Sequence, residues 1–207
     1  MVNYLKLRIF VLFLAAWLAV PAGAEVTPEG DPEGRWLAGR LLVAAPSMSD
    51  PRFAGTVILL VRHDRNGAFG LVVNRAIGRG PIADLLEGAG QDGQGVEGEI
   101  AVHYGGPVEP RLGFVVHSAD YVGPGTERVG ERFAMTAEPA VLRAIGQGNG
   151  PKKRFFAFGY CGWAPDQLES ELKRNDWVTV PADDSLVFGE NLDEVWKRAF
   201  ERRGFDL

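Results

Sequence analysis

Two uninterrupted apolar runs near the start of the chain constrain its fold more than any other feature. Residues 41–45 and 56–61 are apolar or β-branched at every position, and each run has the length of one strand. A strand with one face in water alternates apolar and polar residues, whereas a strand covered on both faces does not. The runs therefore predict central strands of a buried sheet.

Other segments extend this sheet and add helices. Asn66-Gly67 is a strong hairpin signal and predicts antiparallel pairing of residues 56–63 with residues 69–73. Further strands are expected at residues 100–104, 114–117, 133–135, 155–158 and 177–180, and short helices at residues 82–86 and 165–175. Strands outnumber helices and mostly precede them, without regular alternation. This order predicts an α+β fold around a mixed, strongly bent sheet.

Polar residues mark the expected starts of three more helices. The Thr136 hydroxyl can cap a helix that ends at Gly146, and Asp183 or Asp184 can cap a short turn over residues 185–188. The last helix has Asn191 at its start and Glu194 at its third position, as in a capping box. Its apolar side chains follow the spacing of an amphipathic helix.

The first residues have the layout of a signal peptide. Lys6 and Arg8 precede an apolar run over residues 9–20, and Ala22-Gly23-Ala24 follows as a small-residue cleavage site. The run is too short to cross a bilayer as a helix. We expect cleavage after Ala24, no stable membrane span afterwards, a linker over residues 25–36 and one domain over residues 37–207. There are two alternatives to a periplasmic or secreted protein. One is an uncleaved anchor, and the other is a misassigned start, which would leave the protein in the cytoplasm.

The charge of the chain argues against binding to nucleic acid. Its 27 acidic residues outnumber its 22 Lys and Arg residues, and the formal net charge is −5. Binding to nucleic acid draws on clustered basic side chains that neutralise phosphates. The compact basic run Lys152-Lys153-Arg154 is interpreted as a solvated entrance to the next strand, so direct binding to nucleic acid is not expected.

The single cysteine, Cys161, can form no intramolecular disulfide. It lies in Gly159-Tyr160-Cys161-Gly162-Trp163, whose glycines are expected to turn the strand at residues 155–158 sharply into the next helix. That position could favour a thiolate nucleophile. The aromatic neighbours favour the alternative, which is a buried and unreactive thiol.

Four blocks of the chain are distinctive in combination. They are Leu41-Leu42-Val43-Ala44-Ala45-Pro46, Gly67-Ala68-Phe69-Gly70-Leu71-Val72-Val73-Asn74-Arg75, Tyr104-Gly105-Gly106-Pro107-Val108-Glu109-Pro110 with the nearby Gly113-Phe114-Val115-Val116-His117, and the segment around Cys161. Through these blocks the chain resembles the YqgE/AlgH family of bacterial proteins over about residues 37–200. The resemblance implies a bent sheet partly closed like a barrel, with helices packed outside. It implies no reaction, since the family has no agreed molecular activity and its members are often labelled transcriptional regulators.

A candidate binding surface is expected around the Gly-Gly-Pro turn and the segment from Tyr160 to Trp163. Its ten residues are Asn74, Arg75, His103, Gly105, Gly106, Pro107, Glu109, His117, Tyr160 and Trp163. The glycines lack the strand-to-helix setting of a phosphate-binding loop and read as a rigid turn. The three histidines have no short metal-ligand spacing, so no metal and no cofactor are expected.

Three hypotheses about function follow from these features. The first is an exported, non-enzymatic binding or interaction module with an unknown protein or small-molecule partner. The second is a small metal-assisted, hydrolase-like enzyme in which His103, His117 and Glu109 converge. The third is a cytosolic transcriptional regulator, as the family label suggests, although the sequence has no helix-turn-helix and no basic face.

Overall fold

The computed structural model describes residues 36–204, which form ten strands and five helices. The strands are β1 (Arg40–Ala44), β2 (Val57–Asp64), β3 (Gly67–Val72), β4 (Ala76–Pro81), β5 (Glu99–Tyr104), β6 (Val108–Ser118), β7 (Thr126–Val129), β8 (Phe133–Thr136), β9 (Arg154–Trp163) and β10 (Trp177–Pro181). The helices are α1 (Ile82–Gly88), α2 (Ala140–Gly146), α3 (Gln167–Lys173), α4 (Asp184–Val187) and α5 (Leu192–Glu201).

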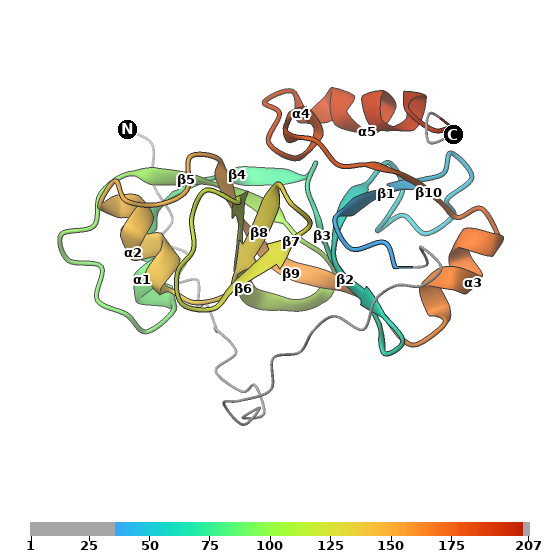
Figure 1. Cartoon of the computed structure of the whole chain (residues 1–207). Helices are drawn as coiled ribbons and strands as arrows, with labels where there is room; N and C mark the ends of the chain where they lie inside the picture. Colours follow the sequence, from blue (N-terminus) through green and yellow to red (C-terminus); the bar gives the residue numbers. More distant parts are fainter. Residues whose placement is uncertain (1–35, 205–207) are drawn as a thin grey trace.

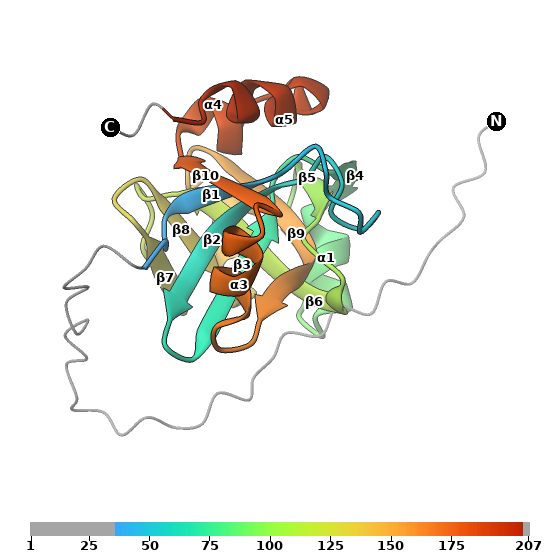
Figure 2. The same cartoon turned by 90° about the vertical axis from the view of Figure 1, so that its right-hand side faces the viewer.

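All ten strands join one curled sheet, with the helices outside it (Figures 1 and 2). The order along the main path is β10-β1-β2-β3-β9-β6-β8-β7, and β5, which pairs with β4, branches from β9. Strand β5 runs parallel to β9, while the other pairs of described strands are antiparallel. The expected α+β fold around a mixed, strongly bent, partly barrel-like sheet is confirmed.

The long strand β9 is the reason for the branching and the curl. Its first half pairs with β5 and β6, and its last residues, Cys161 to Trp163, pair with β3. At the far end of the path, Arg62 of β2 and Glu127 of β7 form an ion pair with 2.7 Å between Nε and Oε1. The sheet therefore closes far enough for β7 to approach β2.

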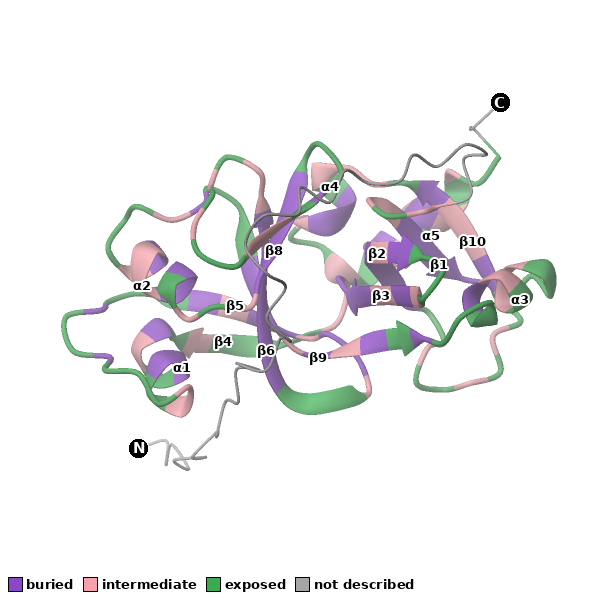
Figure 3. Ribbon diagram, turned by 60° about the horizontal axis from the view of Figure 1, so that its bottom comes forward, coloured by how far each residue is buried: buried purple, intermediate pink, exposed green. Residues whose placement is uncertain are grey.

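The buried apolar residues form three clusters, because helices cover the sheet in three places (Figure 3). The largest cluster lies on the concave face of the sheet and includes Leu186 and Val187 of α4 and Val195 and Ala199 of α5. The second cluster lies under α1 and α2, and the third includes Leu168 of α3. This packing fixes α4 and α5 over one end of the concave face.

Several predictions from the sequence are confirmed in detail. The two apolar runs form β1 and β2 and are almost completely buried. The Asn66-Gly67 hairpin joins β2 to β3. The Asp183 carboxylate caps α4 by accepting hydrogen bonds from the backbone N–H groups of Ser185 and Leu186.

Other expectations about local structure were wrong. Thr136 ends β8 instead of capping a helix, because its buried hydroxyl contacts His117 and Thr126, and α2 begins after Pro139 without a side-chain cap. Asn191 makes no side-chain cap for α5. Instead, a hydrogen bond from the Arg198 guanidinium to the Ser185 hydroxyl holds α5 against α4.

The segment from Gly159 to Trp163 is not a corner between strand and helix. It continues β9, because the positive φ of 70° at Gly159 bends the strand without ending it, and α3 begins only at Gln167. Two strands, β4 and β7, were not predicted. Strand β4 has mostly exposed residues and two glycines, so it has no apolar pattern to recognise.

The expected signal peptide and most of the expected linker lie outside the described residues. Within residues 36–204, no helix has the length and apolar character needed to span a membrane.

Candidate functional site

The two glycines of the Gly-Gly-Pro segment lie where two backbones cross. A Cβ atom added to Gly105 would lie 2.3 Å from the carbonyl oxygen of Gly159, and one added to Gly106 would lie 2.1 Å from the carbonyl carbon of Tyr160. The Gly105 carbonyl accepts a hydrogen bond from the backbone N–H of Val72 at 2.9 Å. These glycines thus join the segment after β5 to β3 and β9, and their small size serves the fold.

Asn74 and Arg75 hold the loop between β1 and β2. The Asn74 amide accepts from the Val57 N–H at 2.8 Å and donates to the Gly55 carbonyl at 2.9 Å. The Arg75 guanidinium donates to the carbonyls of Arg52 and Ala54, at 2.7 and 3.0 Å. Both side chains therefore fasten a strand end to a neighbouring loop.

Two further residues of the predicted surface, Tyr160 and Trp163, lie on β9, and the Gly106 backbone crosses this strand at Tyr160. Tyr160 packs against Phe69, with 4.8 Å between ring centroids, while the Trp163 indole is buried and donates to Glu171 at 2.8 Å. Glu109 is exposed on β6, and Pro107 lies two residues before it in the chain.

Cys161 is 1% exposed. Burial raises the pKa of its thiol to about 12. A thiolate nucleophile would instead need a lowered pKa. The geometry therefore matches the buried, unreactive alternative.

His103 and His117 lie on opposite faces of the sheet. His103 pairs with Ala157 of β9, and Ala157 pairs with Phe114 of β6, so these three side chains share a face. His117 is three residues beyond Phe114 and therefore faces the other way. With a strand between them and the sheet separating their rings, the two imidazoles cannot share an ion or a water molecule.

His117 belongs to a buried chain of hydrogen bonds. Its Nδ1 donates to the Ser118 carbonyl and its Nε2 contacts the Thr136 hydroxyl, both at 2.9 Å. Thr136 in turn contacts the Thr126 hydroxyl at 3.0 Å. Burial lowers the pKa of His117 and favours the neutral ring. Its partners fasten β6 to β7 and β8, so its role is in the fold.

A groove of about 1030 Å³ lies between the paired strands β4 and β5 and the connection from α4 to α5. Its floor has small side chains, so space remains between sheet and helices. Floor and wall are formed by Ala76, Gly78, Ala101, His103, Phe155, Val187 and Phe188. A second hollow of about 500 Å³, which Arg75 and Tyr104 line, adjoins the groove because both contain Ala76 and Leu192.

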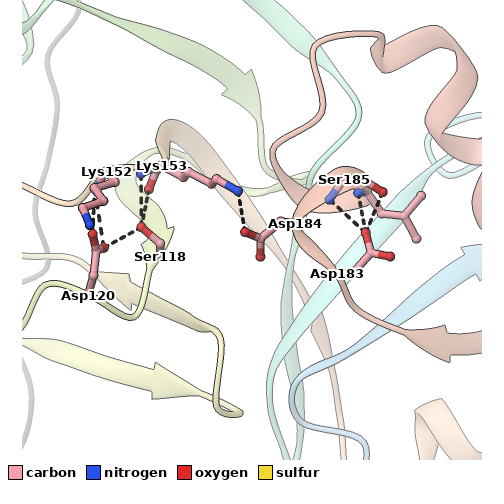
Figure 4. A network of polar contacts seen from close by, with 8 residues as sticks. Ser118, Asp120, Lys152, Lys153, Asp183, Asp184 and Ser185 are labelled. Atoms are coloured by element: carbon pink, nitrogen blue, oxygen red, sulfur yellow. Dashed lines mark hydrogen bonds and ion pairs between the residues drawn. The ribbon is translucent and has the colours of Figure 1, made fainter.

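Two exposed ion pairs lie along this groove. Lys153 at the entrance to β9 reaches Asp184 of α4, with 2.5 Å between Nζ and Oδ2, as Figure 4 shows. Arg79 of β4 lies 3.5 Å from Glu99 of β5, measured from Nε to Oε2. Such exposed pairs are worth only about 0–1 kcal/mol each, so either can open at little cost. Each pair contributes one positive and one negative group, which keeps the charge of the groove nearly balanced.

The polar network around Lys153 holds the groove entrance in place (Figure 4). The Ser118 hydroxyl accepts from the Lys153 N–H at 3.1 Å and donates to the Asp120 carboxylate at 2.6 Å. Across the groove, the Ser185 hydroxyl donates to Asp183 at 2.7 Å. These contacts fix the start of β9 and the start of α4, the two elements that Lys153 and Asp184 connect.

His103 is the most distinctive polar group of the groove. Its ring stacks on Phe155, with 4.2 Å between centroids, and its Nδ1 donates to the Val73 carbonyl at 2.9 Å. Burial lowers the pKa of His103 to about 4, although the bond to Val73 opposes this shift. The ring is therefore neutral near pH 7, and because Nδ1 carries the proton, Nε2 is a free acceptor.

Of the ten predicted surface residues, three lie at this groove or its adjoining hollow: His103, Asn74 and Arg75. The sequence reasoning missed the wall from α4 to α5 and the position of Lys153. The basic run at residues 152–154 was the available signal. It does form the strand entrance that was expected, and it also lines the groove.

Together these features define a class: an α+β protein with a curled, half-closed sheet and a charge-balanced groove between a sheet branch and two C-terminal helices. The chain belongs to the AlgH-like family, whose sequence profile matches residues 41–207. The resemblance to the YqgE/AlgH family is thereby confirmed.

Similar proteins align with most of this chain. A UPF0301 protein from Jannaschia sp. (strain CCS1) is 43% identical, and the match covers 82% of this chain and 90% of that protein. A UPF0301 protein from Methylococcus capsulatus is 42% identical over 87% of this chain and 97% of its own length. The solution structure of AlgH from Pseudomonas aeruginosa has a TM-score of 0.67 and 37% identity, over 84% of this chain and 92% of that one.

Proposed function

We propose that this protein is a non-enzymatic binding module whose ligand site is the groove between the paired strands β4 and β5 and the connection from α4 to α5. The observation that carries the proposal is the groove itself, which has the volume of a small-molecule site and the imidazole acceptor of His103 in its floor. Packing of α4 and α5 on the main core holds its wall in place.

The polar groups of the groove favour binding over catalysis. Ser185 is the hydroxyl residue that lines it, and this hydroxyl is engaged by Asp183 and Arg198. His103 is fixed through Nδ1 to a backbone carbonyl, and no hydrogen bond joins it to Ser185. A nucleophile needs a base within hydrogen-bond reach, and this pair lacks that geometry.

The metal-assisted alternative loses its proposed ligands, because His103 and His117 face opposite sides of the sheet. Within residues 36–204, no three His, Cys, Asp or Glu side chains are grouped so that they could hold a metal ion.

A binding screen with controls tests the proposal. A fragment library containing anionic, cationic and neutral compounds is added to isotope-labelled protein, and shifts of backbone amide signals are mapped. We expect compounds that shift residues of β4, β5 and the connection from α4 to α5. In Ala76→Trp these shifts should disappear, because Ala76 is exposed and a large side chain there fills the groove.

The matched control is Ala164→Trp, which places the same side chain at an exposed position between β9 and α3. It should bind the compounds like the wild type. Compounds that bind only elsewhere, or that bind Ala76→Trp equally well, contradict the groove as the site. Chemical conversion of a bound compound contradicts a non-enzymatic role.

We also propose that the module acts after export, on the strength of the basic, apolar and small-residue parts of its first 24 residues. Fractionation of cells, followed by sequencing of the N-terminus, tests this. A periplasmic or secreted chain beginning at Glu25 is expected. An intact leader on soluble protein from the cytoplasm would contradict export and would favour the cytosolic regulator.

A further inference from the structure

The free acceptor of His103 sets a requirement for any molecule in the groove. The residue is 5% exposed, and its Nδ1 is occupied by the Val73 carbonyl. No group within residues 36–204 bonds to its Nε2, although the ring lines the groove. Nε2 is reached from the groove and is not sealed in the core, so a ligand with an N–H or O–H donor can bond to it.

The charges around His103 set a second requirement. On the face of the sheet that His103 shares, strand alternation places Arg79 and Glu99, and Lys153 meets Asp184 across the groove. Lys152, Arg154 and Glu190 also line the groove, so four basic and three acidic side chains surround it. A charged ligand therefore meets like charges as well as opposite ones, whereas a neutral ligand leaves both ion pairs intact.

The wall supplies the third requirement. Phe188 and Leu192 are half-buried and line the groove, and Phe155 forms part of its floor. These side chains offer apolar contact area beside the polar acceptor, which is the usual composition of a small-molecule site.

We propose that the groove selects an electrically neutral small molecule in which an N–H or O–H donor, bonded to Nε2 of His103, is attached to an apolar body that packs against Phe188 and Leu192. This inference rests on the proposed function, because it specifies the ligand class of the same groove.

Three probes that differ by single groups test the requirements separately. They are the dimethylamide of 4-hydroxyphenylacetic acid, which is neutral and has the phenol as its sole donor, the methyl ether of this phenol, which has no donor, and the anion 4-hydroxyphenylacetate. Dissociation constants are measured from amide shifts of the groove residues. We expect the methyl ether to bind about tenfold more weakly than the phenol, which corresponds to one hydrogen bond. The anion should bind no more tightly than the neutral amide.

Protein variants place the effect on His103 and the groove. His103→Phe keeps a ring but removes the acceptor, and it should bind the phenol and the methyl ether equally. If this variant does not fold, the probe comparison on wild-type protein still decides. Ala76→Trp should bind none of the probes, while Ala164→Trp should behave as the wild type.

The outcomes separate the two proposals. Equal binding of phenol and methyl ether by the wild type, or tighter binding of the anion, overturns the ligand class while leaving the groove as a binding site. Absence of groove binding by these probes, when other library compounds do bind there, also overturns the ligand class alone. Absence of groove binding by every compound overturns the proposed function as well.

Discussion

At the scale of single residues, Gly106 shows how a sequence signature can serve the fold. A side chain there would meet the backbone of Tyr160 at 2.1 Å, and backbone atoms cannot rotate aside as a flexible side chain can. The same crossing buries Cys161, whose Sγ lies 3.5 Å from the Gly105 carbonyl. The segment that most clearly marks the family is thus a joint between strands.

We expect Gly106→Ala to lower the free energy of unfolding by roughly 3 kcal/mol or more, since the crossing must open to admit a Cβ atom. Urea denaturation measures this change. Gly148→Ala is the matched control, because Gly148 also has a positive φ but a Cβ there meets nothing within 4 Å. It should cost only about 1–2 kcal/mol from backbone strain. If both variants lost the same free energy of unfolding, the backbone crossing would not be the reason that position 106 requires glycine.

His103 gives a prediction about pH. Burial lowers its pKa from 6.5 to about 4, so between these values the unfolded chain binds a proton that the folded protein does not. Stability must therefore fall as pH falls through this range. From pH 7 to pH 5, the wild type should lose about 2 kcal/mol more than His103→Gln, as urea denaturation at each pH would measure. Identical losses would show that the imidazole is not held neutral.

At the scale of elements, one carboxylate of α3 bonds to two strands of the sheet. Oε2 of Glu171 accepts from the indole N–H groups of both Trp163 of β9 and Trp177 of β10, each at 2.8 Å. Both indoles are buried, at 7% and 4% exposure. Removal of the carboxylate would leave two buried donors without an acceptor.

Glu171→Ala should therefore lower the free energy of unfolding by roughly 3 kcal/mol, and Glu171→Gln, which keeps an acceptor, by less. Tryptophan fluorescence during urea denaturation reports the change directly. Glu201→Ala, at an exposed position at the end of α5, should stay within about 0.5 kcal/mol of the wild type. A similarly small effect of Glu171→Ala would mean that water replaces the carboxylate.

Prediction of elements from the sequence succeeded where burial imposed a pattern. The runs that form β1 and β2 are apolar because both faces are covered, and the Asn66-Gly67 turn was local enough to read directly. The helix cap predicted at Thr136 was wrong because a hydroxyl group can serve a helix cap and a buried contact between strands equally well. Strand β4 has neither alternation nor β-branched runs, so only its pairing with β5 defines it.

The candidate site was only partly predictable, because it is assembled from distant segments. His103, Asn74 and Arg75 were identified from the sequence, yet the wall that faces His103 comes from residues more than 80 positions later in the chain. His117 seemed a partner of His103, since both flank the same turn. β9 lies between β5 and β6, and its register with both strands places the two histidines on opposite faces; no local signal indicates this pairing.

At the scale of the whole molecule, the groove follows from the branch in the sheet. The pair of strands β4 and β5 leaves the main path at β9, while α4 and α5 are held on the concave face by their own apolar residues. Small side chains on this pair leave the space between these two parts open. The fold thus creates a hollow with an acceptor in its floor.

The most direct test of this account is the protonation state of the His103 ring, read from long-range proton–nitrogen NMR spectra of the labelled protein at pH 7. We expect a proton on Nδ1 and none on Nε2, and a shift of the Nε2 signal when the dimethylamide of 4-hydroxyphenylacetic acid is added but not when its methyl ether is added. A proton on Nε2 of the free protein, or an Nε2 signal unchanged at saturation with the phenol, would contradict the groove as a site built around this acceptor.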